Sequence, residues 1–187
     1  MIMSFLGPDN GINVFYIVSQ LFALVTMISN LVAMQKRKKV QILKFNTLAA
    51  FSAIFHYAFL GAWSGMVIKI VATARDSIAV YEASKNKTSK IIPIIFITFY
   101  LVSGIISFES WASLLPMTSA FIYTIAIYTV DASKIRKYAL VGAILWLIYD
   151  IYVFSIVGIV SETIFILNDL SAIYRFRKKT GKKRRRN

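Results

Sequence analysis

The sequence predicts an all-α transmembrane protein of seven helices, with the N-terminus outside the membrane and the C-terminus inside. Two observations support this fold class. Apolar runs recur along a chain of 187 residues, of which 58% are hydrophobic. Basic residues fill every second gap between these runs, at 36–39, 85–90, 134–137 and 175–186. Because Lys and Arg near membrane ends stay on the cytoplasmic side, the alternation predicts both the number of crossings and their direction.

The apolar runs set the expected helix boundaries. We expect helices at 12–34, 43–62, 66–84, 91–108, 113–130, 138–156 and 158–176. Each is close to the ~20 residues that span a bilayer. The second and sixth helices are followed by very short turns, placed at Ser64-Gly65 and Val157-Gly158, which predict antiparallel hairpins. Residues 1–187 therefore form a single membrane domain that ends in a basic cytoplasmic tail at 177–187.

An internal repeat divides the seven helices into three, one and three. Residues 53–81 align with 146–174 without a gap at an offset of 93, pairing Gly65 with Gly158 and Asp76 with Asp169. The single helix at 91–108 resets the chain direction, so both triplets run in the same sense. We expect two parallel three-helix bundles, at 12–84 and 113–176, joined by a linker helix. SWEET-type transporters have this architecture.

Ionisable side chains inside the predicted helices are the strongest indication of a functional site. A charge near the bilayer centre costs ~2.5–3.5 kcal/mol on insertion scales, so such groups are expected to face one another or a wet cavity. Residues three, four or seven apart share a helix face. The residues concerned are Lys69, Arg75, Asp76, Asp150, Glu162 and Asp169, with His56 on the second helix.

The repeat indicates how these groups meet. The offset places Lys69 opposite Glu162 and Arg75 opposite Asn168. We predict a polar midplane site that includes Arg75, Asp76, Asn168 and Asp169, with an outer ionic gate of Lys69 and Glu162. The alternative interpretation is a set of fixed salt bridges that hold the third and seventh helices together.

Three further residues are candidates for the same site. Because the unperturbed pKa of histidine lies near neutrality, His56 could relay protons, although a single membrane histidine is also typical of neutral hydrogen bonding. Trp146 and Tyr149 lie deep enough in the sixth helix to stack on a ligand ring.

Other classes of function are disfavoured. The chain has no Cys and one His, which excludes thiolate chemistry and a multi-histidine metal centre. No nucleophile is paired with a base and an orienting group, so we expect neither an enzyme nor a cofactor. The net charge of +14 is confined to gaps between apolar runs, which disfavours nucleic-acid binding. The basic tail is expected to contact anionic lipids of the bilayer.

Several segments resemble the bacterial inner-membrane family called YgjV. They are QKRKKVQILKFN at 35–46, FSAIFHYAFLGAWSG at 51–65 and ATARDSIAVY at 72–81, which contain His56 and Arg75. ILWLIYDIYVFSIVGIVSETIFILNDLSAIYRFRK at 144–178 is similar to the closing hairpin of that family, including Gly158, Glu162 and Asn168. The resemblance implies a multi-pass protein of the bacterial inner membrane. The outline also resembles SWEET sugar facilitators and PnuC-type vitamin transporters.

Two functions remain open from the sequence. The first is small-solute transport by alternating access, with Arg75 recognising an anionic or carbonyl-bearing group. The second is a non-transporting receptor or assembly protein that docks partners through its basic tail. A homo-oligomer is compatible with either, although seven helices can enclose a pathway within one chain.

Overall fold

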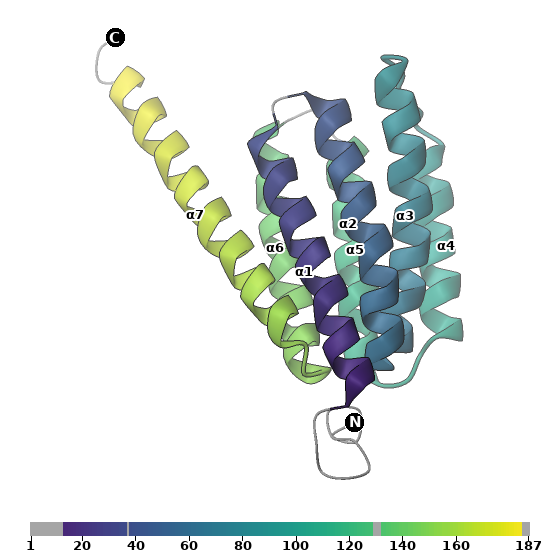
Figure 1. Ribbon diagram of the computed structural model, residues 1–187. Helices are drawn as coiled ribbons and strands as arrows, with labels where there is room; N and C mark the ends of the chain where they lie inside the picture. The colour runs from purple at the N-terminus through teal and green to yellow at the C-terminus, as the bar shows by residue number, and fades with distance from the viewer. Residues whose placement is uncertain (1–12, 37, 129–131, 185–187) are drawn as a thin grey trace.

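The computed structural model describes the backbone of residues 13–36, 38–128 and 132–184, with side chains except at 132–137, 169 and 172–184. Within these residues the fold is all-α, as predicted, and contains seven long helices (Figure 1). They are α1 (Val14–Gln35), α2 (Lys39–Leu60), α3 (Trp63–Ser84), α4 (Ile92–Ile106), α5 (Leu114–Tyr128), α6 (Ala132–Tyr152) and α7 (Ile156–Arg184); a short 3₁₀ turn, η2 (Trp111–Ser113), precedes α5.

The helices form two layers, each helix antiparallel to the one before it. In Figure 1, α1, α2 and α3 make the near layer, and α6, α5 and α4 lie behind them. Consecutive helices pack together, α3 also contacts α5, and α7 returns to contact α1. The triplets α1–α3 and α5–α7 run in the same sense, as the repeat predicts.

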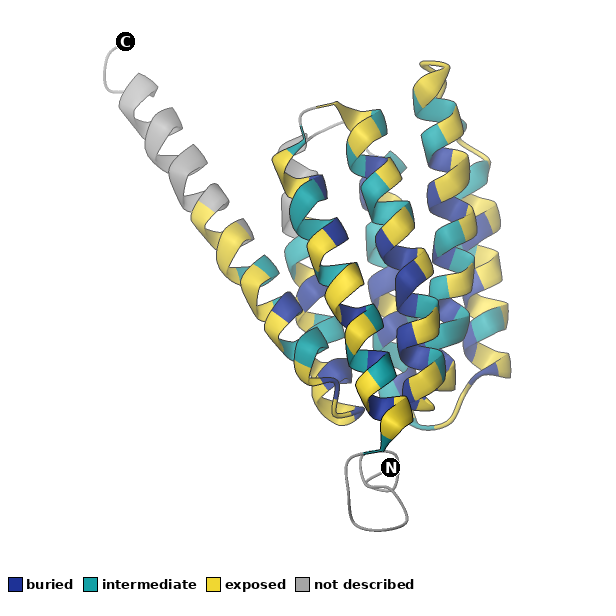
Figure 2. Ribbon diagram, in the orientation of Figure 1, coloured by how far each residue is buried: buried dark blue, intermediate teal, exposed yellow. Residues whose placement is uncertain are grey.

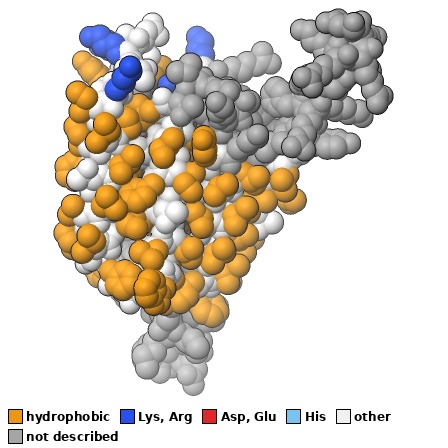
Figure 3. Space-filling model, turned by 180° about the vertical axis from the view of Figure 1, so that it is seen from behind, with side chains coloured by type: hydrophobic (Ala, Val, Ile, Leu, Met, Phe, Trp, Pro, Cys, Tyr) orange, Lys and Arg blue, Asp and Glu red, His pale blue; other side chains and the backbone are white. Residues whose placement is uncertain are grey.

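The outer surface of the bundle is apolar. Figure 2 shows exposed residues along the outward faces of the helices, and Figure 3 shows hydrophobic side chains covering one side of the molecule. The most exposed of them include Ile105, Ile106, Ile94 and Phe99 of α4. By length and composition α1, α2 and the segment Trp111–Tyr128 can each cross a membrane, and α4, Tyr138–Tyr152 and Ile156–Asn168 are shorter apolar stretches.

Basic side chains mark one end of the bundle. The α1–α2 loop, which contains Lys36 and Lys38 and precedes Lys39 of α2, lies together with the α3–α4 loop, residues 85–90, at this basic end (Figures 1 and 3). At the opposite end the described turns, at 61–62, 107–113 and 153–155, contain no Lys or Arg. The charge alternation inferred from the sequence therefore corresponds to the two ends of the fold.

The predicted turn positions are wrong by a few residues. The first hairpin turns at Gly61-Ala62, not at Ser64-Gly65, and the second at 153–155, not at Val157-Gly158. Small residues at Gly65 and Gly158 imitate a turn in the sequence, but both lie in the first turn of a helix. The chain reverses at Gly61 because φ of +71° there closes α2 in the left-handed conformation that favours glycine.

Helix ends in basic segments also extend beyond the prediction. α2 begins at Lys39 rather than 43, α6 begins at Ala132 rather than 138, and α7 continues to Arg184 rather than 176. Most of the predicted tail at 177–187 is therefore helical. Lysine and arginine are good helix formers, so a helix can continue into water after its apolar run has ended.

The two hairpins share one backbone geometry at the offset of 93. Gly61 and Phe154 both have positive φ, at 71° and 57°. The next residue in each case closes the helix, since the N–H of Ala62 donates to the carbonyl of Tyr57 and that of Ser155 to the carbonyl of Asp150. α3 and α7 then begin at Trp63 and Ile156. All these positions differ by 93, so the repeat holds in the backbone.

The absence of cysteine allows a direct test of orientation. We expect a single cysteine at Lys87→Cys to react with an impermeant maleimide only after the cells are permeabilised, because the predicted topology places the basic end in the cytoplasm. Glu109→Cys, at the opposite end, should react in intact cells. Labelling of Lys87→Cys in intact cells would contradict the predicted topology.

Candidate functional site

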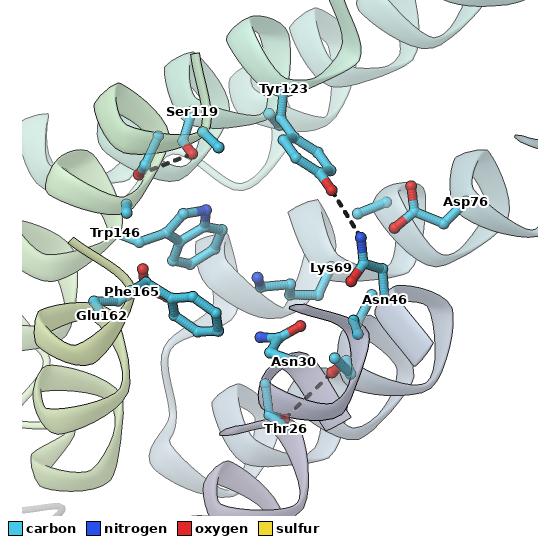
Figure 4. A pocket seen from close by; sticks show the side chains of 18 of the residues that line it. Thr26, Asn30, Asn46, Lys69, Asp76, Ser119, Tyr123, Trp146, Glu162 and Phe165 are labelled. Atoms are coloured by element: carbon cyan, nitrogen blue, oxygen red, sulfur yellow. Dashed lines mark hydrogen bonds between the residues drawn. The ribbon is translucent and has the colours of Figure 1, made fainter. Parts of the chain in front are cut away.

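A cavity of about 390 Å³ lies between the two triplets. Side chains from α1, α2, α3, α5, α6 and α7 line it, and none of the lining residues belongs to α4, the linker. Figure 4 shows many of its polar and aromatic side chains pointing into the same space. They are Thr26, Asn30, Asn46, Lys69, Asp76, Ser119, Tyr123, Trp146, Glu162 and Phe165.

The cavity reaches only the basic end of the bundle. Lys36 of the α1–α2 loop and Met34 at the end of α1 contribute to its lining. Toward the opposite end the lining stops at Thr26, Ile68 and Lys69, well before the turns of that end. The cavity thus enters the bundle from one end and stops inside it.

Arg75 and Asp76 form a buried ion pair on the cavity wall. The two side chains are 3% and 4% exposed, and Nη2 of Arg75 lies 2.8 Å from Oδ1 of Asp76. Nε of Arg75 donates to the same carboxylate oxygen, and Nη1 donates to Oγ1 of Thr124 on α5 at 3.0 Å. The guanidinium is also within 5.1 Å of the Tyr123 ring centre. These contacts pair the Arg75 charge within the protein and connect α3 to α5.

Lys69 and Glu162 also line the cavity, from α3 and α7. The ammonium of Lys69 lies 3.8 Å from the centre of the Trp146 ring, a cation–π contact. Among the described side chains, Arg75–Asp76 is the only ion pair within 4.0 Å, so Lys69 and Glu162 face the cavity without a direct salt bridge. The predicted pairing of these two residues across an outer gate is therefore not formed in this conformation.

Polar residues of α1, α2 and α5 complete the lining. Nδ2 of Asn46 donates to the Tyr123 hydroxyl at 2.8 Å, which joins the two triplets. Asn30 points into the cavity beside Lys69 (Figure 4). Sequence reasoning centred on charges missed these residues. An amide in the middle of an apolar helix was the signal that could have found them, because it also needs a partner away from lipid.

A hydrogen-bonded layer closes the cavity at the opposite end. We call it the closing layer, and it consists of His56, Tyr57, Ser64, Tyr149, Asp150 and Ser155. The hydroxyl of Tyr57 donates to Oδ1 of Asp150 at 2.9 Å. The hydroxyl of Tyr149 is hydrogen-bonded to Ser64 and accepts the N–H of Gly65. The Trp146 ring stacks on the Tyr57 ring, with 5.4 Å between the ring centres. These two rings therefore form the closed end of the cavity.

His56 has a hydrogen-bond partner on each ring nitrogen in this layer. Nδ1 lies 2.8 Å from the carbonyl oxygen of Ser19, which can only accept, so Nδ1 bears the proton. Nε2 lies 3.0 Å from the Ser155 hydroxyl and, in the neutral ring, accepts its hydrogen. This arrangement matches the hydrogen-bonding interpretation of His56, and its role as a proton relay stays a prediction.

Glycine at 65 and 158 lets the helices approach within the closing layer. A Cβ at Gly65 would lie 2.9 Å from the Tyr149 ring and 3.0 Å from that of Tyr57. A Cβ at Gly158 would overlap Asp150 and Ser155. The matched glycines of the repeat are therefore required by packing rather than by a turn.

The structure brings most of the predicted site residues together. Arg75, Asp76, Asn168, Trp146, Lys69 and Glu162 all line the cavity. Asn168 is at its margin, exposed, with its amide 3.9 Å from the Met34 sulfur. His56 and Tyr149 belong instead to the closing layer, with 3% and 1% exposure. The side chain of Asp169 is outside the described residues.

An apolar exterior, basic residues at one end and ionisable groups kept inside the bundle define a multi-pass helical membrane protein. The chain belongs to the Imp-YgjV family of bacterial inner membrane proteins, whose family model matches residues 17–180. The resemblance noted in the sequence and the inner-membrane location are thereby confirmed. The comparisons with curated proteins and with solved structures give no match.

Among the residues of the cavity wall, a single substitution in the buried Arg75–Asp76 pair should destabilise the protein most. Arg75→Ala would leave the Asp76 carboxylate buried without its partner, which costs about 3–5 kcal/mol of stability. We expect a large drop in thermal unfolding temperature for the purified protein in detergent. The double variant Arg75→Met with Asp76→Leu should recover much of this loss, and an equal loss in both variants would contradict the assignment.

The closing layer should loosen when its central hydrogen bond is removed. Tyr57→Phe leaves buried Asp150 without a donor, at a cost of about 1–3 kcal/mol. We expect a cysteine at Ala72, inside the cavity, to react faster with an impermeant methanethiosulfonate added outside intact cells. The matched control is Ala72→Cys with Tyr57 intact, and identical labelling rates would show that the layer does not limit access.

Proposed function

We propose that this inner-membrane protein transports a small polar solute by alternating access, with the cavity as its binding site. The observation that supports transport is a cavity with polar and charged side chains in its lining, which reaches the basic end of the bundle and is closed at the other. Such a conformation corresponds to one of the two states that alternating access requires.

The size and lining of the cavity suit a small molecule. Ligand pockets usually measure ~300–1,000 Å³, and this cavity is at the lower end of that range, at about 390 Å³. Its lining combines aromatic surface at Trp146 and Phe165 with polar groups from both triplets. A solute bound here would contact both halves of the molecule at once.

The closing layer suggests how the other end could open. Its hydrogen bonds join residues of different triplets, as in Tyr57 with Asp150 and Tyr149 with Ser64. Rotation of one triplet against the other would break these few contacts while leaving each triplet intact. Toward the basic end, α7 leans away from the rest of the bundle (Figure 1), so the same rotation could bring it back toward α1.

Filling the cavity should abolish transport without changing the exterior. Ala72 lines the cavity, whereas Ile70, two residues away, is 47% exposed on the outer face of α3. We expect liposomes with the wild-type protein to take up, saturably, at least one solute from a panel of radiolabelled glucose, uridine, thiamine and L-phenylalanine.

Ala72→Trp should block that uptake, because the indole occupies the cavity. Ile70→Trp is the matched control and should transport normally. Uptake that persists in Ala72→Trp would remove the cavity from the pathway. A wild-type protein that transports none of these solutes would instead favour a receptor or assembly role.

A further inference from the structure

Two opposite charges line the cavity without a direct salt bridge between them or to another side chain of the described residues. Lys69 and Glu162 both line it, and within the described part of the chain neither forms an ion pair within 4.0 Å. They come from different triplets, α3 and α7. A charge held inside the bundle is less well stabilised than in bulk water unless it is paired, so this arrangement favours a ligand that supplies a charge of opposite sign to each residue.

Arg75 is not free for the same purpose. Its guanidinium is held by two bonds to Asp76 and one to Thr124. The sequence-based assignment of anion recognition to Arg75 therefore transfers to Lys69, whose ammonium lies over the Trp146 ring and forms no direct salt bridge among the described side chains.

Aromatic surface lies beside both charges. The ring of Trp146 is under the Lys69 ammonium at 3.8 Å. Phe165 follows Glu162 by three residues on α7, so the two share a face of the helix and both line the cavity. Figure 4 shows Trp146 and Phe165 bordering the space into which Lys69 points.

We propose that the cavity binds a zwitterionic amino acid with an apolar or aromatic side chain. This inference rests on the proposed transport function and names its substrate class. The ligand carboxylate pairs with Lys69, its ammonium pairs with Glu162, and its side chain packs against Trp146 and Phe165. An anion or a cation alone would leave one of the two protein charges unpaired, and a neutral sugar would leave both.

Three ligands with the same ring separate the two charge contacts. They are L-phenylalanine, 2-phenylethylamine, which lacks the carboxylate, and 3-phenylpropanoate, which lacks the ammonium. We expect L-phenylalanine to raise the unfolding temperature of the purified full-length protein saturably. Each analogue should bind about tenfold more weakly or worse, because it loses one charge-assisted contact.

Variants at the two charges should change the preference in opposite ways. Lys69→Met removes the contact to the ligand carboxylate. In this variant L-phenylalanine should therefore bind no more tightly than 2-phenylethylamine. Glu162→Gln should do the same relative to 3-phenylpropanoate. A variant that merely misfolds would weaken all three ligands alike. It could not make L-phenylalanine equal to 2-phenylethylamine in one variant and to 3-phenylpropanoate in the other. Lys85→Met, at the exposed basic end, is the matched control and should keep the wild-type order.

The outcomes distinguish this inference from transport itself. Equal shifts with all three ligands, no shift with any, or an unchanged order in both variants would overturn the zwitterion site. Uptake of another panel solute that Ala72→Trp blocks would then leave transport standing. L-Phenylalanine binding that depends on Lys69 and Glu162, without uptake in liposomes, would support the site and overturn transport.

Discussion

Partnering of polar groups away from lipid is the constraint on which this structure depends. Hydrocarbon offers no hydrogen bonds, so a charged side chain inside the bundle needs a partner within the protein or a cavity. Arg75 meets this need through Asp76 and Thr124, and Asp150 meets it through Tyr57. The same contacts tie α3 to α5 and α2 to α6, so satisfying the charges also assembles the two triplets.

The internal repeat determines where those contacts form. Tyr57 and Asp150 are themselves 93 residues apart, which makes the central bond of the closing layer a contact between equivalent positions. His56 and Tyr149 are also equivalent, and each reaches from its own hairpin to the helix start of the other triplet. Sequence identity between the halves is low, but the backbone turns at Gly61 and Phe154 preserve the relation. The repeat is therefore conserved in geometry more than in residue type.

Much of the fold follows from the sequence, and the limits of prediction have physical causes. Apolar run length and the position of Lys and Arg give the number, order and direction of the helices. The predicted turn positions are wrong because glycine is common both in turns and where helices pack closely. Gly65 and Gly158 are of the second kind. The charged cavity residues were predictable because a membrane charge is costly. The placement of His56 and Tyr149 was not, since depth along a helix does not show which end of a cavity is closed.

The position of α4 has a consequence for how much of its sequence matters. This helix contributes no residue to the cavity, and its exposed face is among the most apolar of the molecule. Its requirement is to cross once and return the chain to the side where the second triplet must start. Substitutions on its lipid-facing side should be tolerated as long as the new residues are apolar. Inserting or deleting one crossing would instead reverse the orientation of the second triplet in the membrane.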